Sequence, residues 1–188
     1  SREGCQLLVR MGFAPALAQE QIVLRGVVEE AIAVRRQESH GAGAIGPAPG
    51  LAVEALDRAA GMQALCGTEL EFIVFRDSYE QAWQAGYRDL TPANLYNVDY
   101  SMLGTARVEP LLRRIRMCMA GAGMVVESAK GECNLGQHEI AFKYQDALRT
   151  CDNHVVYKAG AKEIAAQEGM SLTFMAKYNE REGNSCHI

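Results

Sequence analysis

The pattern of apolar and polar positions predicts alternating strands and helices over the last three-quarters of this 188-residue chain. Runs rich in apolar residues and typical of strands occur at Thr68–Phe75, Met124–Ser128, Gln137–Tyr144 and Met170–Lys177. Helical spacing of apolar residues, with suitable end signals, occurs at Leu51–Leu65, Asp77–Gly86, Val108–Ala120 and Asp146–Glu168. The alternation favours a domain of mixed α and β structure.

Local signals support several of these boundaries. Asp77 or Ser78 is expected to cap the helix that follows it. Pro110 is tolerable only in the first turn of its helix, and Gly121 and Gly123 are expected to end that helix. The stretch Tyr87–Leu103 contains Pro92, Asn94 and Asn97 and is predicted to be a loop.

The first 50 residues differ in texture from the rest and are not assigned to a domain. Gln21–Arg36 has the periodicity of one amphipathic helix, and Ser39–Gly50 is rich in glycine, alanine and proline, as in a linker. The chain does not begin with methionine, so it is expected to be a processed or truncated piece.

Composition excludes several classes of protein. The chain is 48% hydrophobic with a formal net charge of −4, which is ordinary for one soluble domain. No basic stripe indicates a nucleic-acid partner, and no apolar run approaches the roughly 20 residues that span a bilayer. Six cysteines without a CxxC pair are expected to be reduced thiols of a cytoplasmic protein.

Five glutamates in strand-like contexts are the candidate chemistry. Glu69 and Glu71 share one face of their predicted strand, because side chains alternate along a strand. Glu132 and Glu139 flank a segment in which Leu135–Gly136 can form a turn, and Glu127 precedes them. Converging carboxylates repel one another, and a hard divalent cation such as Mg²⁺ or Mn²⁺ removes that conflict. The alternative is that these carboxylates face solvent.

Four motifs in order resemble the glutamine synthetase family. They are GTELEF at Gly67–Phe72, ES-AKG-E-CNLGQHE at Glu127–Glu139, the helix with Asp152–His154 and Tyr157–Lys158, and LTFMAKY followed by GNSCH at Leu172–His187. The resemblance covers residues 51–188 and implies the N-terminal part of that family's catalytic domain. It implies an α+β fold in which helices back a curved antiparallel sheet.

The resemblance also implies roles for individual residues. Glu71, Glu132 and Glu139 match ligands of a first Mg²⁺ or Mn²⁺ ion, and Glu69 and His187 match ligands of a second. Glu127 and Tyr144 match nucleotide-binding positions, and Gly183 matches a position that contacts substrate glutamate. ATP would phosphorylate the γ-carboxylate of glutamate, and ammonia would then displace the phosphate. A ring-shaped homo-oligomer is expected for the complete enzyme.

A departure from the family and the range of amines that the family uses keep alternatives open. The chain ends one residue after His187, before further family ligands, so the isolated chain is expected to have little or no ligase activity. The same scaffold serves ligases that join glutamate to ethanolamine or polyamines, and this γ-glutamyl–amine activity is the first alternative. A non-catalytic remnant that binds metal or nucleotide is the second, and an α+β domain with surface acids is the third.

Overall fold

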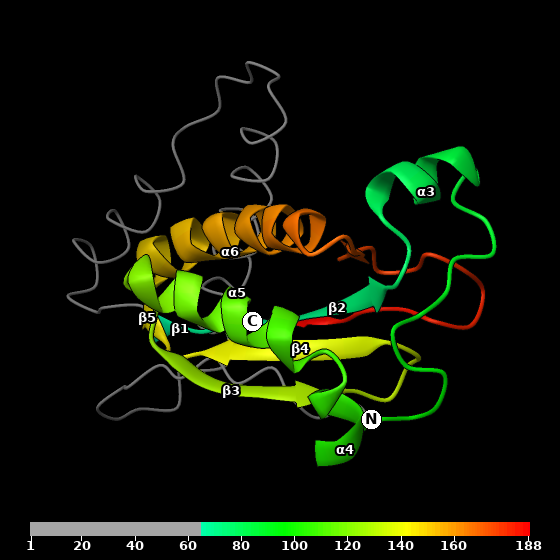
Figure 1. Cartoon of the computed structure of the whole chain (residues 1–188). Coiled ribbons are helices and arrows are strands. Elements are labelled where there is room, and N and C mark those ends of the chain that lie inside the picture. The colour runs from blue at the N-terminus through cyan, green and yellow to red at the C-terminus, as the bar shows by residue number, and fades with distance from the viewer. Residues whose placement is uncertain (1–64) are drawn as a thin grey trace. The chain divides into compact units, whose positions relative to one another are not determined.

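The computed structural model describes residues 65–188 (Figure 1). The helix predicted at Gln21–Arg36 and nearly all of the one at Leu51–Leu65 lie outside these residues, and Leu65 itself belongs to a strand. The contacts divide the described chain into two compact units. One comprises Glu69–Lys143 with Tyr157–Cys186, and the other comprises residues 65–68, 144–156 and 187–188.

A sheet of five strands organises the larger unit. The strand order is β3-β4-β2-β6, and β7 also pairs with β2. The pairings of β2 with β4, β2 with β6 and β3 with β4 are antiparallel. The strands are β2 (Glu69–Phe75), β3 (Val126–Gly131), β4 (Gln137–Phe142), β6 (Ser171–Thr173) and β7 (Cys186–His187).

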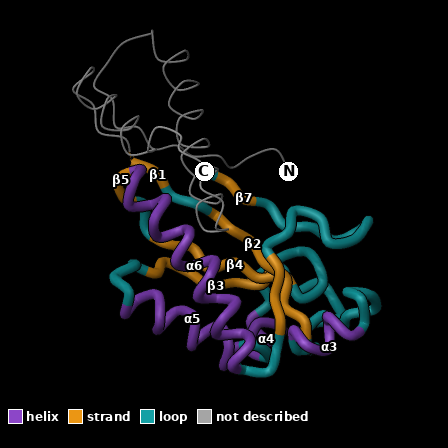
Figure 2. Tube along the Cα trace, turned by 90° about the horizontal axis from the view of Figure 1, so that it is seen from above, coloured by secondary structure: helices purple, strands orange, loops and turns teal. Residues whose placement is uncertain are grey.

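Helices cover one face of this sheet. Figures 1 and 2 show α5 (Glu109–Gly121) beside the second half of α6 (Ala147–Gln167), both on the same face. Leu70, Phe72 and Val74 of β2 pack against these helices, because alternate residues of a strand share a face. The core also contains Leu111, Leu112, Ile115, Met119, Ile140, Tyr157, Ala161, Ile164, Ala165 and Leu172. The predicted α+β fold with an antiparallel sheet backed by helices is confirmed.

Part of the opposite face of the sheet is polar, although farther along β2 the same face carries the buried residues Ile73 and Phe75. In β2 this face carries Glu69 and Glu71, and Glu71 lies directly across from Glu139 of β4. Lys130 of β3 lies across from Glu139 on the other side. Glu71, Glu139 and Lys130 therefore form one row across three neighbouring strands.

The smaller unit contains a two-stranded antiparallel ribbon and the start of α6. Strand β1 (Leu65–Cys66) pairs with β5 (Gln145–Asp146), and the Thr150 hydroxyl of α6 donates to the Cys66 carbonyl at 2.8 Å. Burial raises the pKa of the Cys66 thiol to about 11. Cys66 and Cys151 are buried, whereas Cys118 and Cys133 are exposed.

Several predicted boundaries are confirmed. Ser78 caps α3 (Tyr79–Gln84) through a capping box in which its side chain and that of Gln81 bond each other's backbone N–H groups. Pro110 lies in the first turn of α5, as expected. Helix α5 includes Gly121, and the chain leaves it through Gly123, whose φ of +86° places it in the left-handed region that favours glycine.

Two secondary-structure predictions are wrong. Helix α4 (Met102–Ala106) begins inside the predicted loop, because the Ser101 side chain accepts from the Gly104 N–H and caps a short helix. Strand β6 ends at Thr173, well before Lys177. The Asn184 side-chain amide donates to the carbonyls of Thr173 and Met175, at 3.2 and 3.0 Å, and so bonds these groups outside a strand ladder. Among residues 65–188, no helix combines the length and apolarity needed to cross a bilayer.

Candidate functional site

A tight connection between β3 and β4 brings Glu132 and Glu139 together. The Glu132 N–H donates to the Gln137 carbonyl at 2.9 Å, and the Gln137 N–H donates to the Asn134 carbonyl at 3.1 Å. Gly136 has a φ of +68° at this connection, which agrees with the predicted turn. Its carbonyl accepts from the Val74 N–H at 2.9 Å, so the turn is attached to β2.

Three carboxylates converge on the polar face of the sheet. The nearest oxygens of Glu71, Glu132 and Glu139 all lie within 4.8 Å of one another. Glu139 is buried, and Glu71 and Glu132 are partly buried. We call these three residues the carboxylate trio. The structure therefore brings together three of the five acidic positions that the sequence singles out.

Neighbouring polar groups fix the orientation of Glu71. One oxygen of its carboxylate accepts from the Gln137 side-chain amide at 2.8 Å and from the Ser185 N–H at 2.6 Å. The Gln137 amide also donates to the Gly183 carbonyl at 2.9 Å. The side chain of Asn134 donates to the same carbonyl at 2.6 Å. These bonds join the Gly183–Ser185 segment to the trio.

Lys130 supplies the nearest positive charge. Its ammonium forms ion pairs with Glu132 and, at 3.5 Å, with Glu139. Burial is the main cause that raises the pKa of Glu139 above its usual value. Lys130 opposes this rise, and the charges of Glu69 and Glu71 add to it. The trio therefore carries more negative charge than Lys130 neutralises.

The donor set fits a hard divalent cation. Mg²⁺ takes oxygen ligands in near-octahedral geometry at roughly 2.1 Å, so neighbouring ligand atoms are about 3 Å apart and opposite ones about 4.2 Å apart. One carboxylate oxygen from each residue of the trio lies within 4.8 Å of the others, which is compatible with this spacing. A divalent cation would also neutralise charge that the protein leaves uncompensated.

The other predicted site residues lie outside the trio. Glu69 is exposed on the same strand face as Glu71, and Glu127 is exposed on β3. Tyr144 follows β4 and is 43% exposed. His187 lies in β7 and is partly buried. Among residues 65–188, neither group of side chains spaced to hold a metal ion includes any of these four.

Gly183 occupies a position where a side chain would not fit. A Cβ atom added there would lie 2.4 Å from the Ala176 carbonyl oxygen. The close approach of the two backbones positions the Gly183 carbonyl to accept from Gln137 and Asn134. Sequence reasoning assigned no role to Lys130, Gln137 or Ser185, because their contacts depend on strand register and on a loop distant in sequence.

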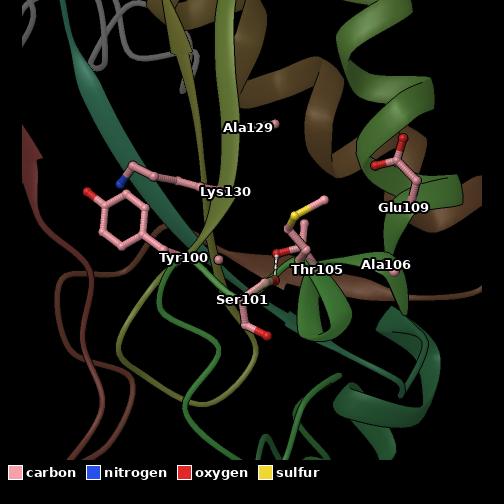
Figure 3. A pocket seen from close by; sticks show the side chains of 9 residues that line it. Tyr100, Ser101, Thr105, Ala106, Glu109, Ala129 and Lys130 are labelled. Carbon is pink, nitrogen blue, oxygen red and sulfur yellow. Dashed lines mark hydrogen bonds between the residues drawn. The ribbon is translucent and has the colours of Figure 1, made fainter.

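Two further features adjoin the trio. Asp99 and Cys133 lie close enough to Glu132 to form a second potential ligand group, and a hydrogen bond to Asp99 raises the pKa of the Cys133 thiol. Figure 3 shows a surface pocket of about 320 Å³ beside β3, with Lys130 and Tyr100 along one edge. The trio does not line it, and its one carboxylate, Glu109, is paired with Arg116 at 2.6 Å.

Acidification is expected to destabilise the chain through His138, which neighbours Glu139 but is buried on the opposite face of the sheet. Burial lowers the pKa of His138 from 6.5 to about 4, and the Asn94 amide nitrogen lies 3.3 Å from its Nε2. Between pH 6.5 and 4 the His138 ring binds a proton in the unfolded state but stays mostly neutral in the folded state. Stability conferred by His138 is therefore full above pH 6.5 and falls by up to about 3 kcal/mol by pH 4.

Histidine-selective nuclear magnetic resonance, recorded in chelator from pH 7.5 to 4.5, measures this pKa directly. Urea unfolding at the same pH values measures the stability. We expect the His138 ring of the folded chain to stay mostly neutral over this range and the unfolding free energy to decline below pH 6.5. A ring that titrates above pH 6 in the folded chain would contradict the expectation.

Comparison with known proteins finds relatives that are named as synthetases or ligases. A family model described as the glutamine synthetase catalytic domain matches residues 51–188. The chain is 80% identical over 128 residues to the gamma-glutamylethanolamide synthetase GlnA4 of Streptomyces coelicolor, covering 68% of this chain and 28% of that protein. It is 36% identical over 129 residues to the glutamate–isopropylamine ligase of a Pseudomonas species, with the same two coverages.

Solved structures agree with these sequence relatives. Two structures of GmaS, one without ligand and one in complex with ADP, each superpose with a TM-score of 0.62 at 29% identity. Each match covers 74% of this chain and 32% of that one. The chain thus spans less than a third of the length of each protein compared here.

Proposed function

This chain belongs to the glutamine synthetase family, and we propose that it forms part of an ATP-dependent ligase that joins the γ-carboxylate of glutamate to an amine. The names of both sequence relatives specify an amine larger than ammonia: ethanolamine at 80% identity and isopropylamine at 36%. The 80% identity is the observation that carries the proposal. It supports the γ-glutamyl–amine alternative better than the ammonia-dependent activity that was expected first.

The proposed metal site is the carboxylate trio. Glu71, Glu132 and Glu139 would hold one Mg²⁺ or Mn²⁺ ion, and their spacing and excess negative charge support this assignment. A bound divalent cation would offset the negative charge that separates a carboxylate from the phosphates of ATP. Gln137 and the Ser185 N–H would keep Glu71 oriented, because both donate to one of its oxygens and leave the other available.

The remaining assignments rest on the family resemblance. Glu69 and His187 would bind a second ion, and Glu127 and Tyr144 would contact ATP. The GmaS complex with ADP supports nucleotide binding in a homologous fold. Gly183 would contact glutamate, and its attachment to Gln137 places that loop next to the trio. A cytoplasmic location and a ring-shaped homo-oligomer remain proposals for the complete enzyme.

A substrate comparison with the full-length protein tests the proposed activity. ADP release is measured with saturating glutamate and MgATP, using ethanolamine, isopropylamine or ammonia as the amine. We expect kcat/KM for ethanolamine to exceed that for ammonia by at least about tenfold, since contacts to added carbon and hydroxyl groups discriminate substrates by about this factor.

Controls separate the possible failures of this proposal. Omitting glutamate is expected to abolish ADP release that depends on the amine. A preference for ammonia would overturn the choice of amine and leave the ligase class intact. Absence of glutamate-dependent turnover with all three amines would overturn the ligase proposal and favour the non-catalytic remnant.

A further inference from the structure

Lys130 reaches the oxygens that the proposed metal site would use. Its register opposite Glu139 places it on the polar face of the sheet. Its ammonium contacts Glu132 and lies 3.5 Å from Glu139. The Lys130 side chain is 24% exposed, against 12% for Glu132 and 6% for Glu139, so water screens these contacts only partly.

When no metal is bound, the Lys130 ammonium reduces the repulsion among the carboxylates of the trio. Three carboxylates in contact repel one another, and a single adjacent ammonium reduces this repulsion. A divalent cation would do the same through the same oxygens of Glu132 and Glu139. The ammonium and the cation would repel each other at this distance, so binding of either weakens binding of the other.

We propose that Lys130 is an internal counter-ion that competes with the divalent cation for Glu132 and Glu139, and thereby sets the metal affinity of the site. Lys130 is a positioning residue in this account, because it acts through the trio. The inference rests on the metal site of the proposed function and adds a residue that limits how tightly that site holds its cation.

Tyr100 offers the ammonium a second partner. The Lys130 Nζ lies 5.1 Å from the centre of the Tyr100 ring, and Figure 3 shows the two side chains together. The Tyr100 N–H donates to the Gly131 carbonyl at 3.2 Å, which holds the tyrosine beside β3. A cation–π contact would retain the ammonium near the ring when a metal takes the carboxylate oxygens.

Replacing Lys130 with methionine tests this competition. Methionine keeps an unbranched apolar stem and removes the ammonium. We expect Lys130→Met to bind Mn²⁺ about tenfold more tightly in calorimetric titration of the full chain. We also expect a lower melting temperature than the parent in chelator, and a smaller difference at saturating Mn²⁺, because the cation then supplies the missing positive charge.

Two matched variants control this experiment. Lys143→Met removes the same charge four residues beyond Glu139, which is about 13 Å along an extended chain, and is expected to change Mn²⁺ affinity less than twofold. Lys130→Arg keeps the charge. It is expected to keep the parent's affinity for Mn²⁺ and the parent's melting temperature in the presence of a chelator. The methionine variant can be compared with the arginine variant even when it does not fold. If Lys130→Arg folds and Lys130→Met does not, the positive charge itself is needed, which supports the counter-ion role.

The outcomes distinguish this inference from the function on which it rests. Unchanged or weaker Mn²⁺ binding by a folded Lys130→Met variant would overturn the competition and leave the metal site standing. Absence of Mn²⁺ binding by the parent and all variants would overturn both the inference and the metal site of the proposed function.

Discussion

Glu139→Gln is expected to weaken Mn²⁺ binding by at least about 100-fold. A unit negative charge about 2.1 Å from a divalent cation contributes about 4 kcal/mol even at the dielectric constant of water, and each 1.4 kcal/mol corresponds to a factor of ten. Calorimetric titration of Mn²⁺ into the parent and the variant measures this loss. In chelator the variant is expected to melt at or above the parent's temperature at neutral pH.

The sign of that stability effect follows from the pKa of Glu139. Burial raises this pKa above its usual value, so ionisation of Glu139 costs more in the folded chain than in the unfolded chain. The folded protein therefore loses stability as the pH rises above about 4.5, and a neutral amide removes this cost. Metal affinity and metal-free stability should thus change in opposite directions.

Glu163→Gln is the matched control for this variant. Glu163 is exposed on α6, and its replacement removes the same charge outside the trio. We expect its Mn²⁺ affinity to stay within about twofold of the parent's, because exposed charges are strongly screened. Equal effects of the two substitutions would mean that Mn²⁺ responds to net charge and not to the trio.

Gly136→Ala is expected to destabilise the chain by roughly 2–5 kcal/mol. The φ of +68° at Gly136 makes any side chain there unfavourable by about 1–2 kcal/mol. A Cβ would also lie 2.6 Å from the Val74 carbonyl oxygen, which accepts from the Ala93 N–H, and such overpacking adds about 1–3 kcal/mol. Urea unfolding in chelator measures the total.

Gly86→Ala separates the two causes of this destabilisation. Gly86 has a φ of +61°, and a Cβ there would meet no atom within 4 Å. It is therefore expected to cost only the conformational part, about 1–2 kcal/mol. Similar losses for both variants would show that the Gly136 turn tolerates a methyl group against β2. If Gly136→Ala loses more stability than Gly86→Ala, we also expect it to bind Mn²⁺ more weakly, because this turn positions Glu132 and Glu139.

Local sequence patterns were sufficient where the structure depends on neighbouring residues. The strand carrying Glu69 and Glu71, the Ser78 cap, Pro110 in the first turn of its helix and the turn at Gly136 were all predicted correctly. In each case the physical cause lies within a few positions along the chain: alternation of side chains, a capping hydroxyl, or a residue with special backbone freedom.

Local patterns were insufficient where distant segments meet. Lys130 faces Glu139 only because β3 and β4 pair in one register, and a shift by one residue would place it among the apolar core residues. The Ser185 N–H reaches Glu71 across 114 positions of sequence. The early end of β6 likewise depends on bonds from Asn184.

The five glutamates that the sequence pattern groups together differ in burial in the structure. The interpretation that all five glutamates are surface carboxylates is wrong for Glu139, whose side chain is 6% exposed. It agrees with the exposure of Glu69 and Glu127. Burial of a carboxylate that lies within 4.8 Å of two others needs a compensating charge, and Lys130 supplies only part of it. This imbalance is the physical basis of the proposed metal site.

Anomalous diffraction from crystals of the protein grown with Mn²⁺ would show directly whether the carboxylate trio binds the ion. We expect a strong manganese peak bound by carboxylate oxygens of Glu71, Glu132 and Glu139, at about 2.2 Å from each. We also expect the Lys130 ammonium to lie farther from Glu132 than in the metal-free chain. A map with no manganese at the trio, in crystals that hold the ion at other carboxylates, would contradict the assignment of the trio as a metal site.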